Sequence, residues 1–416
     1  EAQESKSQTE RFIDRFSKLY TPAVLAVAAL VALVPPLAFG GDPRDWLYKG
    51  LAILLIGCPC ALVISTPAAI AAGLSAGARR GLLMKGGAVL ETLGKVTAIA
   101  FDKTGTLTTG KPVVTDIVGG TRTTAQVLSM AAALERASSH PLAVAVLERA
   151  KVEKVPVPPS FDAGAVPGEG VEGGVGGERV FFGSFQGAVT RTTLSDGQVE
   201  TVRAFNAEGK TVSVVVVDGT VAGFIAMRDE ARPDTLSVLA CLKASGIRAI
   251  MLTGDNIRTA EAIAGTLGIE ARGELLPQDK VRIVRELQME ALVVAKVGDG
   301  INDAPALAAA DVGIAMGGGS DVALETADAA VLHGRVQDIP DMIALSESVM
   351  GNIHQNIAIA LGLKVIFLVT TVAGITGLWP AILADTGATV LVTANAMRVL
   401  AWKPRGQHAG RTPYER

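Results

Sequence analysis

An apolar run without a single charged residue extends from Leu51 to Ala78. A helix needs about 20 apolar residues to cross the hydrocarbon core of a bilayer, and this run is longer. Of the 416 residues, 49% are hydrophobic, which is high for a soluble protein. The run therefore predicts a membrane-spanning helix that continues beyond the bilayer as a stalk.

Three further apolar stretches are long enough to span a membrane. The stretch 21–39 is joined to the long run by a Gly-Gly-Asp-Pro turn at 40–43. The stretches 357–375 and 378–400 are joined by Thr376-Gly377. The sequence therefore predicts two helical hairpins in an integral membrane protein, with the lipid bilayer as one partner.

The positions of basic residues predict the orientation of these hairpins. Lysine and arginine gather beside the spans, at Arg11, Arg15, Lys18, Arg79, Arg80, Lys85, Arg398, Lys403 and Arg405. Because cytoplasmic ends carry such residues, we expect everything between Arg79 and His354 to be cytoplasmic and the membrane to be the plasma (inner) membrane. The polar start, 1–18, lacks the pattern of a signal peptide and predicts a helix that enters the membrane in a chain beginning mid-protein.

Charge and cysteine content narrow the class of protein. A formal net charge of −3 provides no basic footprint for nucleic acid. Two of the three cysteines, Cys58 and Cys60, are one residue apart, which disfavours a disulfide between them and indicates a reduced protein. The third, Cys241, lies in an apolar-periodic helix at 236–244 and is expected in the core.

The segment between the hairpins alternates β-branched runs with helical stretches. Runs typical of buried parallel strands occur at 97–101, 247–252, 291–297 and 312–315, and helical stretches follow at 259–267 and 278–287. Such alternation predicts a doubly wound α/β sheet.

An insert of about 112–227 separates the first strand of this sheet from the others. It contains a hairpin signal, Asp218-Gly219, between the runs 211–217 and 221–227. The insert predicts an antiparallel α+β domain, in which we expect the proline-rich 155–159 and the glycine-rich 164–177 to be loops.

One seven-residue motif, Asp102-Lys103-Thr104-Gly105-Thr106-Leu107-Thr108, follows the first predicted strand. The glycine lets the backbone turn sharply beside the carboxylate of Asp102. A carboxylate presented in this way can attack a phosphoryl group and become an acyl phosphate. The alternative, an aspartate in a polar turn, applies to most isolated Asp-Lys pairs.

Further polar motifs follow other predicted strands, where open α/β sheets place their ligands. The hydroxyl and N–H groups of Thr253-Gly254-Asp255 suit a phosphate oxygen. The carboxylates and the amide of Gly298-Asp299-Gly300-Ile301-Asn302-Asp303 suit Mg²⁺. Lys280 offers a positive charge for a transferring phosphoryl group, although alone it would read as a solvated helix residue.

These motifs resemble those of the P-type ATPases, cation pumps within the haloacid-dehalogenase-like superfamily, over essentially the whole chain. The resemblance implies that ATP phosphorylates Asp102 and that Asp102, Thr104 and Asp299 hold Mg²⁺. It places the remaining motif residues around the phosphate, namely Lys103, Thr253, Gly254, Asp255, Lys280, Asn302 and Asp303.

The insert resembles the nucleotide-binding domain of the heavy-metal branch. That branch carries Ser-Glu-His-Pro, which appears here as Ser138-Ser139-His140-Pro141, and a Gly-x-Gly loop, which appears as Gly168-Glu169-Gly170. The resemblance implies that ATP contacts Glu135, His140, Gly168 and Gly170, with Asp229 and Arg232 nearby at the junction of the two domains. Outside such a motif, a histidine at a helix start would merely be exposed.

Cys58-Pro59-Cys60 lies within the long apolar run. The proline removes an N–H and breaks the helix, which exposes carbonyl groups for ion binding. Thiolates prefer Zn²⁺, Cd²⁺, Pb²⁺ or Cu⁺ to hard cations. The alternative is a pair of small buried cysteines.

The second hairpin carries two intramembrane charges, Lys364 and Asp385, which could pair. Its Leu378-Trp379-Pro380-Ala381 and Asp385-Thr386-Gly387-Ala388-Thr389 resemble zinc/cadmium/lead exporters, and the copper(I) motifs of this branch are missing. The resemblance implies that Asp385 is a third ligand of a divalent ion beside Cys58 and Cys60, with Lys364 as compensating charge.

The sequence thus predicts an ATP-driven exporter of Zn²⁺, Cd²⁺ or Pb²⁺, with copper(I) export, a tethered phosphatase and a metal sensor as alternatives. No Thr-Gly-Glu of an actuator domain occurs, so we expect an N-terminal part of the pump as a partner. The expected domains are a stalk (1–20), a hairpin with stalk (21–95), a phosphorylation domain (96–111 and 228–345), a nucleotide-binding domain (112–227), a second hairpin (346–403) and a tail (404–416).

Overall fold

The computed structural model describes residues 6–138, 140–318, 320–372 and 377–404. The chain divides into two compact units. The first comprises 1–96, 328–333 and 338–416, and the second comprises 97–327 and 334–337. Ser139, Thr376 of the predicted turn and nearly all of the predicted tail lie outside the described residues.

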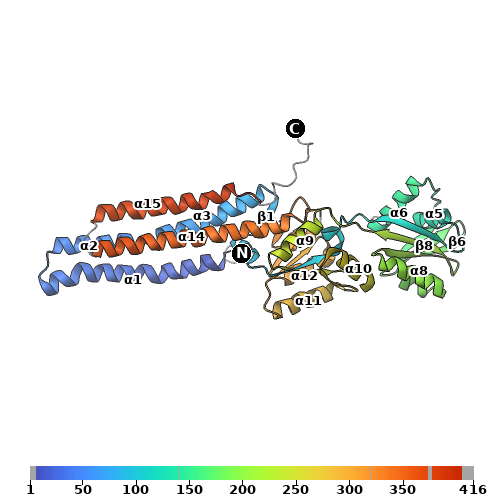
Figure 1. The fold of residues 1–416 in the computed structure, drawn as a ribbon, viewed down its shortest axis with the longest axis horizontal. Helices are drawn as coiled ribbons and strands as arrows, with labels where there is room; N and C mark the ends of the chain where they lie inside the picture. Colours follow the sequence, from blue (N-terminus) through green and yellow to red (C-terminus); the bar gives the residue numbers. More distant parts are fainter. Residues whose placement is uncertain (1–5, 139, 319, 373–376, 405–416) are drawn as a thin grey trace, which may run out of the picture. The chain divides into compact units, whose positions relative to one another are not determined.

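Long helices that lie side by side form most of the first unit (Figure 1). They are α1 (Gln8–Phe39), α2 (Pro43–Gly57), α3 (Cys60–Ala78), α14 (Asp338–Val372) and α15 (Leu378–Met397). Shorter elements accompany them: α4 (Gly87–Leu93), the 3₁₀ helix η3 (Arg398–Ala401), and the strands β1 (Leu82–Met84) and β13 (Ala329–Val331), which pair antiparallel.

Three helical segments of the described chain are long and apolar enough to cross a membrane, Gln8–Phe39, Pro43–Ala78 and Asp338–Thr371. The predicted stalk and the first span form one continuous helix from Gln8. The fourth predicted span forms α15 but is not among the three, since Asp385 and Asn395 lower its hydropathy.

The turn between α1 and α2 follows from its sequence. Gly40 ends α1 in the left-handed region, at φ 68°. Asp42 caps α2 by accepting a hydrogen bond from the N–H of Arg44, and Pro43 occupies the first turn, where no N–H is needed.

The predicted break at Cys58-Pro59-Cys60 is confirmed. Helix α2 ends at Gly57 and α3 begins at Cys60, with Cys58 in an extended conformation (φ −62°, ψ 124°). Pro59 has no N–H with which to continue the helical ladder. Carbonyl groups near the break are therefore available to other donors.

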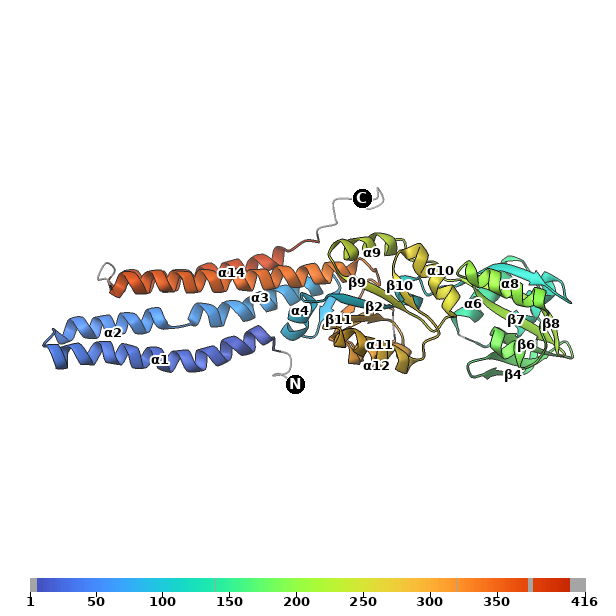
Figure 2. The same ribbon diagram turned by 60° about the horizontal axis from the view of Figure 1, so that its bottom comes forward.

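A parallel sheet forms the centre of the second unit, and it confirms the predicted doubly wound fold. Its strands follow in the spatial order β12 (Val312–Met316), β11 (Val294–Gly298), β2 (Ala98–Asp102), β9 (Arg248–Leu252) and β10 (Glu270–Arg272). Figure 2 shows α9 (Thr235–Ala244) and α10 (Ile257–Leu267) on one side, and α11 (Pro277–Met289) and α12 (Ala304–Ala309) on the other. Helix α13 (Asp321–Thr326) follows β12.

Strand β11 begins three residues later than predicted. Ala291 takes a positive φ of 60° after α11, which delays the extended conformation. The N–H of Val293 is bound by the hydroxyl of Thr97, so ladder pairing starts only at Val294.

The insert forms an antiparallel sheet with helices, as predicted. Its strands have the spatial order β3 (Val113–Gly119), β8 (Thr220–Arg228), β7 (Thr211–Val217), β6 (Glu178–Gly183), β5 (Gly170–Val175) and β4 (Ser160–Val166). The helices are α5 (Thr124–Glu135), α6 (Pro141–Val152), α7 (Phe185–Val189) and α8 (Asp196–Ala207). Hydrophobic side chains fill two clusters, one including α5 and α6 and the other α7 and α8.

The two ends of the insert pair with each other. Strand β3, at its start, lies antiparallel to β8, at its end. Just outside these strands, Thr108 bridges to Ala231, and the N–H of Thr109 donates to the carbonyl of Glu230. The insert is therefore attached through a two-stranded stem.

The predicted hairpin is confirmed, since Asp218 and Gly219, both at positive φ, connect β7 and β8. Two other local predictions for this unit, a loop at 164–177 and a buried Cys241, are wrong. The glycine-rich 164–177 is not a loop, because it contains β5 and the end of β4. A Cβ at Gly173 would lie 2.8 Å from the Cα of Ala163, so this glycine permits close strand packing. Cys241 is exposed, because α9 buries the face of Thr235, Val238, Leu239 and Leu242 instead.

Candidate active site and membrane metal site

Strand β2 presents Asp102 as its last residue, with the side chain almost entirely buried. The following turn, η1 (Lys103–Leu107), contains Gly105 at φ 71°. A Cβ at Gly105 would lie 1.6 Å from Oδ2 of Asp299. Only glycine at this position allows the two carboxylate-bearing loops to approach so closely.

Three carboxylates meet at this edge of the sheet. Asp102, Asp299 after β11, and Asp303 in the 3₁₀ helix η2 (Ile301–Asp303) each offer an oxygen within 4.8 Å of the others. Burial, together with the charges of Asp102 and Asp303, raises the pKa of Asp299 to about 6. Burial also raises the pKa of Asp102. Carboxylate oxygens are hard donors, and three neighbouring carboxyl groups are costly to ionise together unless a cation compensates them. The cluster therefore fits a bound Mg²⁺ ion.

Lys280, on α11, lies among these carboxylates. Its Nζ is 2.5 Å from Oδ1 of Asp102 and 2.8 Å from Oδ1 of Asp303. Burial lowers its pKa, but the charges of Asp102 and Asp303 outweigh burial and raise it overall. The alternative of a solvated helix residue is therefore wrong, because the ammonium group is buried at the site.

The Thr253-Gly254-Asp255 motif lies after β9, beside β2. Thr253 is buried, and its hydroxyl accepts a hydrogen bond from the N–H of Asp255. The carboxylate of Asp255 forms an ion pair with Lys103. Thr104 and Asn302 are exposed, so a phosphate-bearing ligand could reach them from solvent.

Asp229 and Arg232 anchor the turn that follows Asp102. The guanidinium of Arg232 donates to the carbonyl of Thr106 at 3.0 Å and to that of Gly105 at 2.7 Å. The hydroxyl of Thr108 donates to the carboxylate of Asp229. The resemblance predicts that Asp229 and Arg232 lie at the junction of the two cytoplasmic domains. In the structure, both residues contact the turn that follows Asp102.

Four predicted nucleotide-site residues lie in the insert. Glu135 ends α5 with a buried carboxyl group, and burial raises its pKa overall, although the hydrogen bond with Ser138 and the charge of His140 lower it. His140 is exposed and caps α6, its Nδ1 accepting from the N–H of Leu142. Gly168, at φ 76°, and Gly170 lie at the turn between β4 and β5, where a Cβ on Gly170 would be 2.3 Å from the carbonyl oxygen of Phe182.

Sequence reasoning missed Lys296. This residue lies in the middle of β11 and is fully buried, with its Nζ 3.4 Å from Oδ1 of Asp303. The available signal was a lysine inside an otherwise apolar strand that leads directly into Gly298-Asp299.

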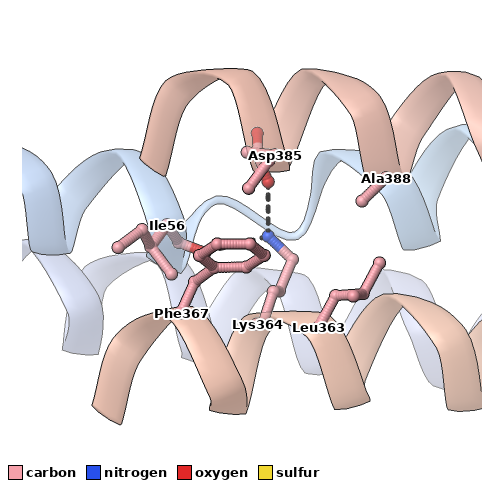
Figure 3. A pocket seen from close by; sticks show the side chains of 7 residues that line it. Ile56, Leu363, Lys364, Phe367, Asp385 and Ala388 are labelled. Carbon is pink, nitrogen blue, oxygen red and sulfur yellow. Dashed lines mark hydrogen bonds and ion pairs between the residues drawn. The ribbon is translucent and has the colours of Figure 1, made fainter. Parts of the chain in front are cut away.

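In the first unit, called the membrane unit because it contains the three candidate membrane-spanning segments, Lys364 on α14 reaches the break between α2 and α3 (Figure 3). Its Nζ donates to Oδ1 of Asp385 on α15 and to the carbonyl of Ile56, both at 2.9 Å, and to the carbonyl of Cys58. The predicted pairing of Lys364 with Asp385 is confirmed. A small pocket between these helices is lined by Ile56, Leu363, Lys364, Phe367, Ala384, Asp385 and Ala388.

Cys58 and Cys60 lie at the same break and are joined by a disulfide in this structure. Their Cα atoms are 5.4 Å apart, which is within reach of such a bond, so the prediction that the spacing disfavours it is wrong. A soft metal ion is held by thiolates. Metal binding at this break therefore requires the reduced pair.

We expect Asp299→Asn to stabilise the metal-free protein at pH 8 and to abolish stabilisation by Mg²⁺. A folded-state pKa of about 6, above the ordinary 3.8, means that ionisation opposes folding above pH 6. This opposition disappears as the pH falls through 6 towards 3.8. After discounting for a partly exposed side chain, the gain is roughly 1 kcal/mol.

Thermal unfolding in EDTA and in Mg²⁺, at pH 8 and pH 4, measures both effects. A variant that unfolds at the wild-type temperature in EDTA and still responds to Mg²⁺ would contradict the assignment.

The comparisons agree with this architecture. The haloacid dehalogenase-like hydrolase family matches residues 96–311. The chain is 54% identical to a zinc/cadmium/lead-transporting P-type ATPase of Escherichia coli (strain K12), over 96% of this chain and 54% of that protein. It is 43% identical to a probable cadmium-transporting ATPase of Staphylococcus aureus (strain MRSA252), over 97% of this chain and 57% of that protein.

A crystal structure of a zinc-transporting PIB-type ATPase in the E2.Pi state superimposes with a TM-score of 0.79. The two sequences are 53% identical, over 96% of this chain and 65% of the other. The chain belongs to the haloacid dehalogenase-like hydrolases and, within them, to the heavy-metal P-type ATPases. It spans about half the length of the curated relatives it matches.

Proposed function

We propose that this chain carries the phosphorylation and ion-binding machinery of an ATP-driven exporter of a soft divalent metal ion, Zn²⁺, Cd²⁺ or Pb²⁺. The observation that carries the proposal is the carboxylate of Asp385, held by Lys364 at the helix break that bears Cys58 and Cys60. Two thiolates and one carboxylate would overcompensate the charge of a divalent ion, and the ammonium of Lys364 would restore neutrality.

In the second unit we propose that Asp102 attacks the γ-phosphoryl group of ATP. A bond forms between a carboxylate oxygen and phosphorus, the bond from phosphorus to the oxygen of ADP breaks, and ADP leaves with that electron pair. Lys280 neutralises charge on Asp102 and on the transferring group, because its Nζ already touches the nucleophile. Asp102, Thr104 and Asp299 would hold Mg²⁺, which supplies further charge neutralisation when bound.

The remaining predicted residues have supporting roles in this proposal. Thr253 and Gly254 orient phosphate oxygens, Asp255 positions Lys103, and Asn302 and Asp303 complete the polar edge.

In the insert, Glu135, His140, Gly168 and Gly170 would bind the nucleotide. Asp229 and Arg232 would fix the turn after Asp102 through the bonds described above.

Metal-dependent phosphorylation tests the proposal. Membranes containing the protein are incubated with ATP radiolabelled at the γ-phosphate and with Zn²⁺, Cd²⁺ or Cu⁺, under reducing conditions. We expect an acid-stable phosphoprotein with Zn²⁺ or Cd²⁺ that is lost in Asp102→Asn and in Asp385→Ala. Labelling with Cu⁺ alone would favour copper(I) export, and labelling indifferent to every metal would favour a tethered phosphotransfer enzyme.

A further inference from the structure

Lys296 carries a buried amino group for which the proposed chemistry assigns no role; burial lowers the pKa of this group, opposed by the charges of Asp303 and Asp102. Its side chain is 0% exposed, and its Nζ donates to the carbonyl of Val297 at 2.8 Å. Burying an ammonium group costs several kcal/mol unless it is compensated. Since the neighbouring positions of β11 carry valine and alanine, an apolar side chain would satisfy the strand itself.

The compensation comes from the active-site carboxylates. Oδ1 of Asp303 lies 3.4 Å from Nζ of Lys296 and 2.8 Å from Nζ of Lys280, so two ammonium groups meet at one oxygen. Lys280 in turn contacts Asp102. Burial raises the pKa of Asp303, but the charges of Lys296 and Lys280 outweigh it and lower that pKa overall.

We propose that Lys296 is a positioning residue that fixes Asp303 against Lys280 and makes the electrostatic potential at Asp102 more positive. The inference deepens the proposed phosphoryl transfer and rests on it. The cluster of Asp102, Asp299 and Asp303 carries three carboxyl groups, and Lys280 alone supplies a single positive charge beside them. Three ionised carboxylates with one ammonium group would attract cations and repel phosphate. A second fixed cation shifts this balance towards phosphoryl anions at the expense of Mg²⁺.

This role and a purely structural one predict different results. Removing a positive charge about 10 Å from a bound ion, at an effective dielectric constant of about 20, changes the affinity for a singly charged ion about tenfold and that for doubly charged Mg²⁺ about a hundredfold or more. The change has opposite signs for cations and anions. A packing defect in β11 instead weakens the binding of both.

The test measures the affinity of the full chain, purified in detergent, for Mg²⁺ alone and for orthovanadate at saturating Mg²⁺, both by calorimetry. The variants are Lys296→Met, which preserves length and apolar packing, and Lys296→Gln, which keeps a donor for the carbonyl of Val297. Lys243→Met, at an exposed position of α9, is the matched control. Lys296→Arg retains the charge.

We expect both neutral variants to bind Mg²⁺ about a hundredfold more tightly and orthovanadate about tenfold more weakly, with Lys296→Arg and Lys243→Met near the wild type. If Lys296→Met fails to fold, Lys296→Gln alone decides the outcome. Unchanged affinities, or weaker binding of both ions, overturn the inference while the proposed function stands. A wild-type protein that binds neither ion overturns both.

Discussion

Gly105→Ala lowers the initial rate of phosphorylation about 100-fold. Alanine at φ 71° is strained, and its Cβ would occupy the position of Oδ2 of Asp299. Asp299 must then move away, and the turn, tied to Arg232 through the carbonyls of Gly105 and Thr106, cannot readily yield. A displacement of about 1 Å in such a site costs roughly 100-fold in rate.

The measurement is the initial rate of phosphorylation by γ-labelled ATP. Gly246→Ala is the matched control, because Gly246 has a similar φ of 76° but no atom within 4 Å of its added Cβ. It carries the same kind of backbone strain in open space. A Gly105→Ala protein that phosphorylates within twofold of the control would contradict the steric argument.

Asp385→Ala and Lys364→Met each destabilise the membrane unit more than the double variant does. Each single change leaves a charge unpaired inside the membrane, at a cost of about 2.5–3.5 kcal/mol, whereas the double variant leaves none. The carbonyls of Ile56 and Cys58 also lose their donor when Lys364 is removed. We expect phosphorylation to lose its dependence on Zn²⁺ in Asp385→Ala and in the double variant. The double variant should lose it even though it is the more stable of the two.

Thermal unfolding in detergent and Zn²⁺-dependent phosphorylation provide the two measurements. Thr393→Ala is the control, since this α15 residue donates within its own helix, to the carbonyl of Thr389. Additive losses of stability in the double variant would mean that the two charges act independently, contrary to the 2.9 Å contact between them.

Much of the fold was predictable because its signals are local. Buried strands appear as β-branched runs, and glycine next to aspartate at their ends indicates where backbone and ligand approach. The break at Pro59 and the hairpin at Asp218-Gly219 depend on the backbone properties of single residues. For the same reason, the motifs of Asp102 and Asp299 could be expected at one edge of the sheet.

The failures depend on contacts between distant residues. Gly173 lies in a strand because Ala163 packs against it, and composition alone suggested a loop. Cys241 lies on the exposed side of α9, and the apolar residues of this ten-residue helix are spread too widely around its axis for the sequence to show which side is buried. The sequence marked Lys296 as a lysine inside an apolar strand, but its contact with Asp303, seven positions later in the sequence, is seen only in the structure.

The two-stranded stem of the insert has a consequence for how such chains can diversify. Because Thr108 and Ala231 are already paired, the backbone enters and leaves the insert at neighbouring points. Residues between them can be lengthened, shortened or exchanged at little entropic cost to the sheet that holds Asp102. The site that we propose to form an acyl phosphate and the insert that we propose to bind its phosphate donor are therefore free to evolve at separate rates within one gene.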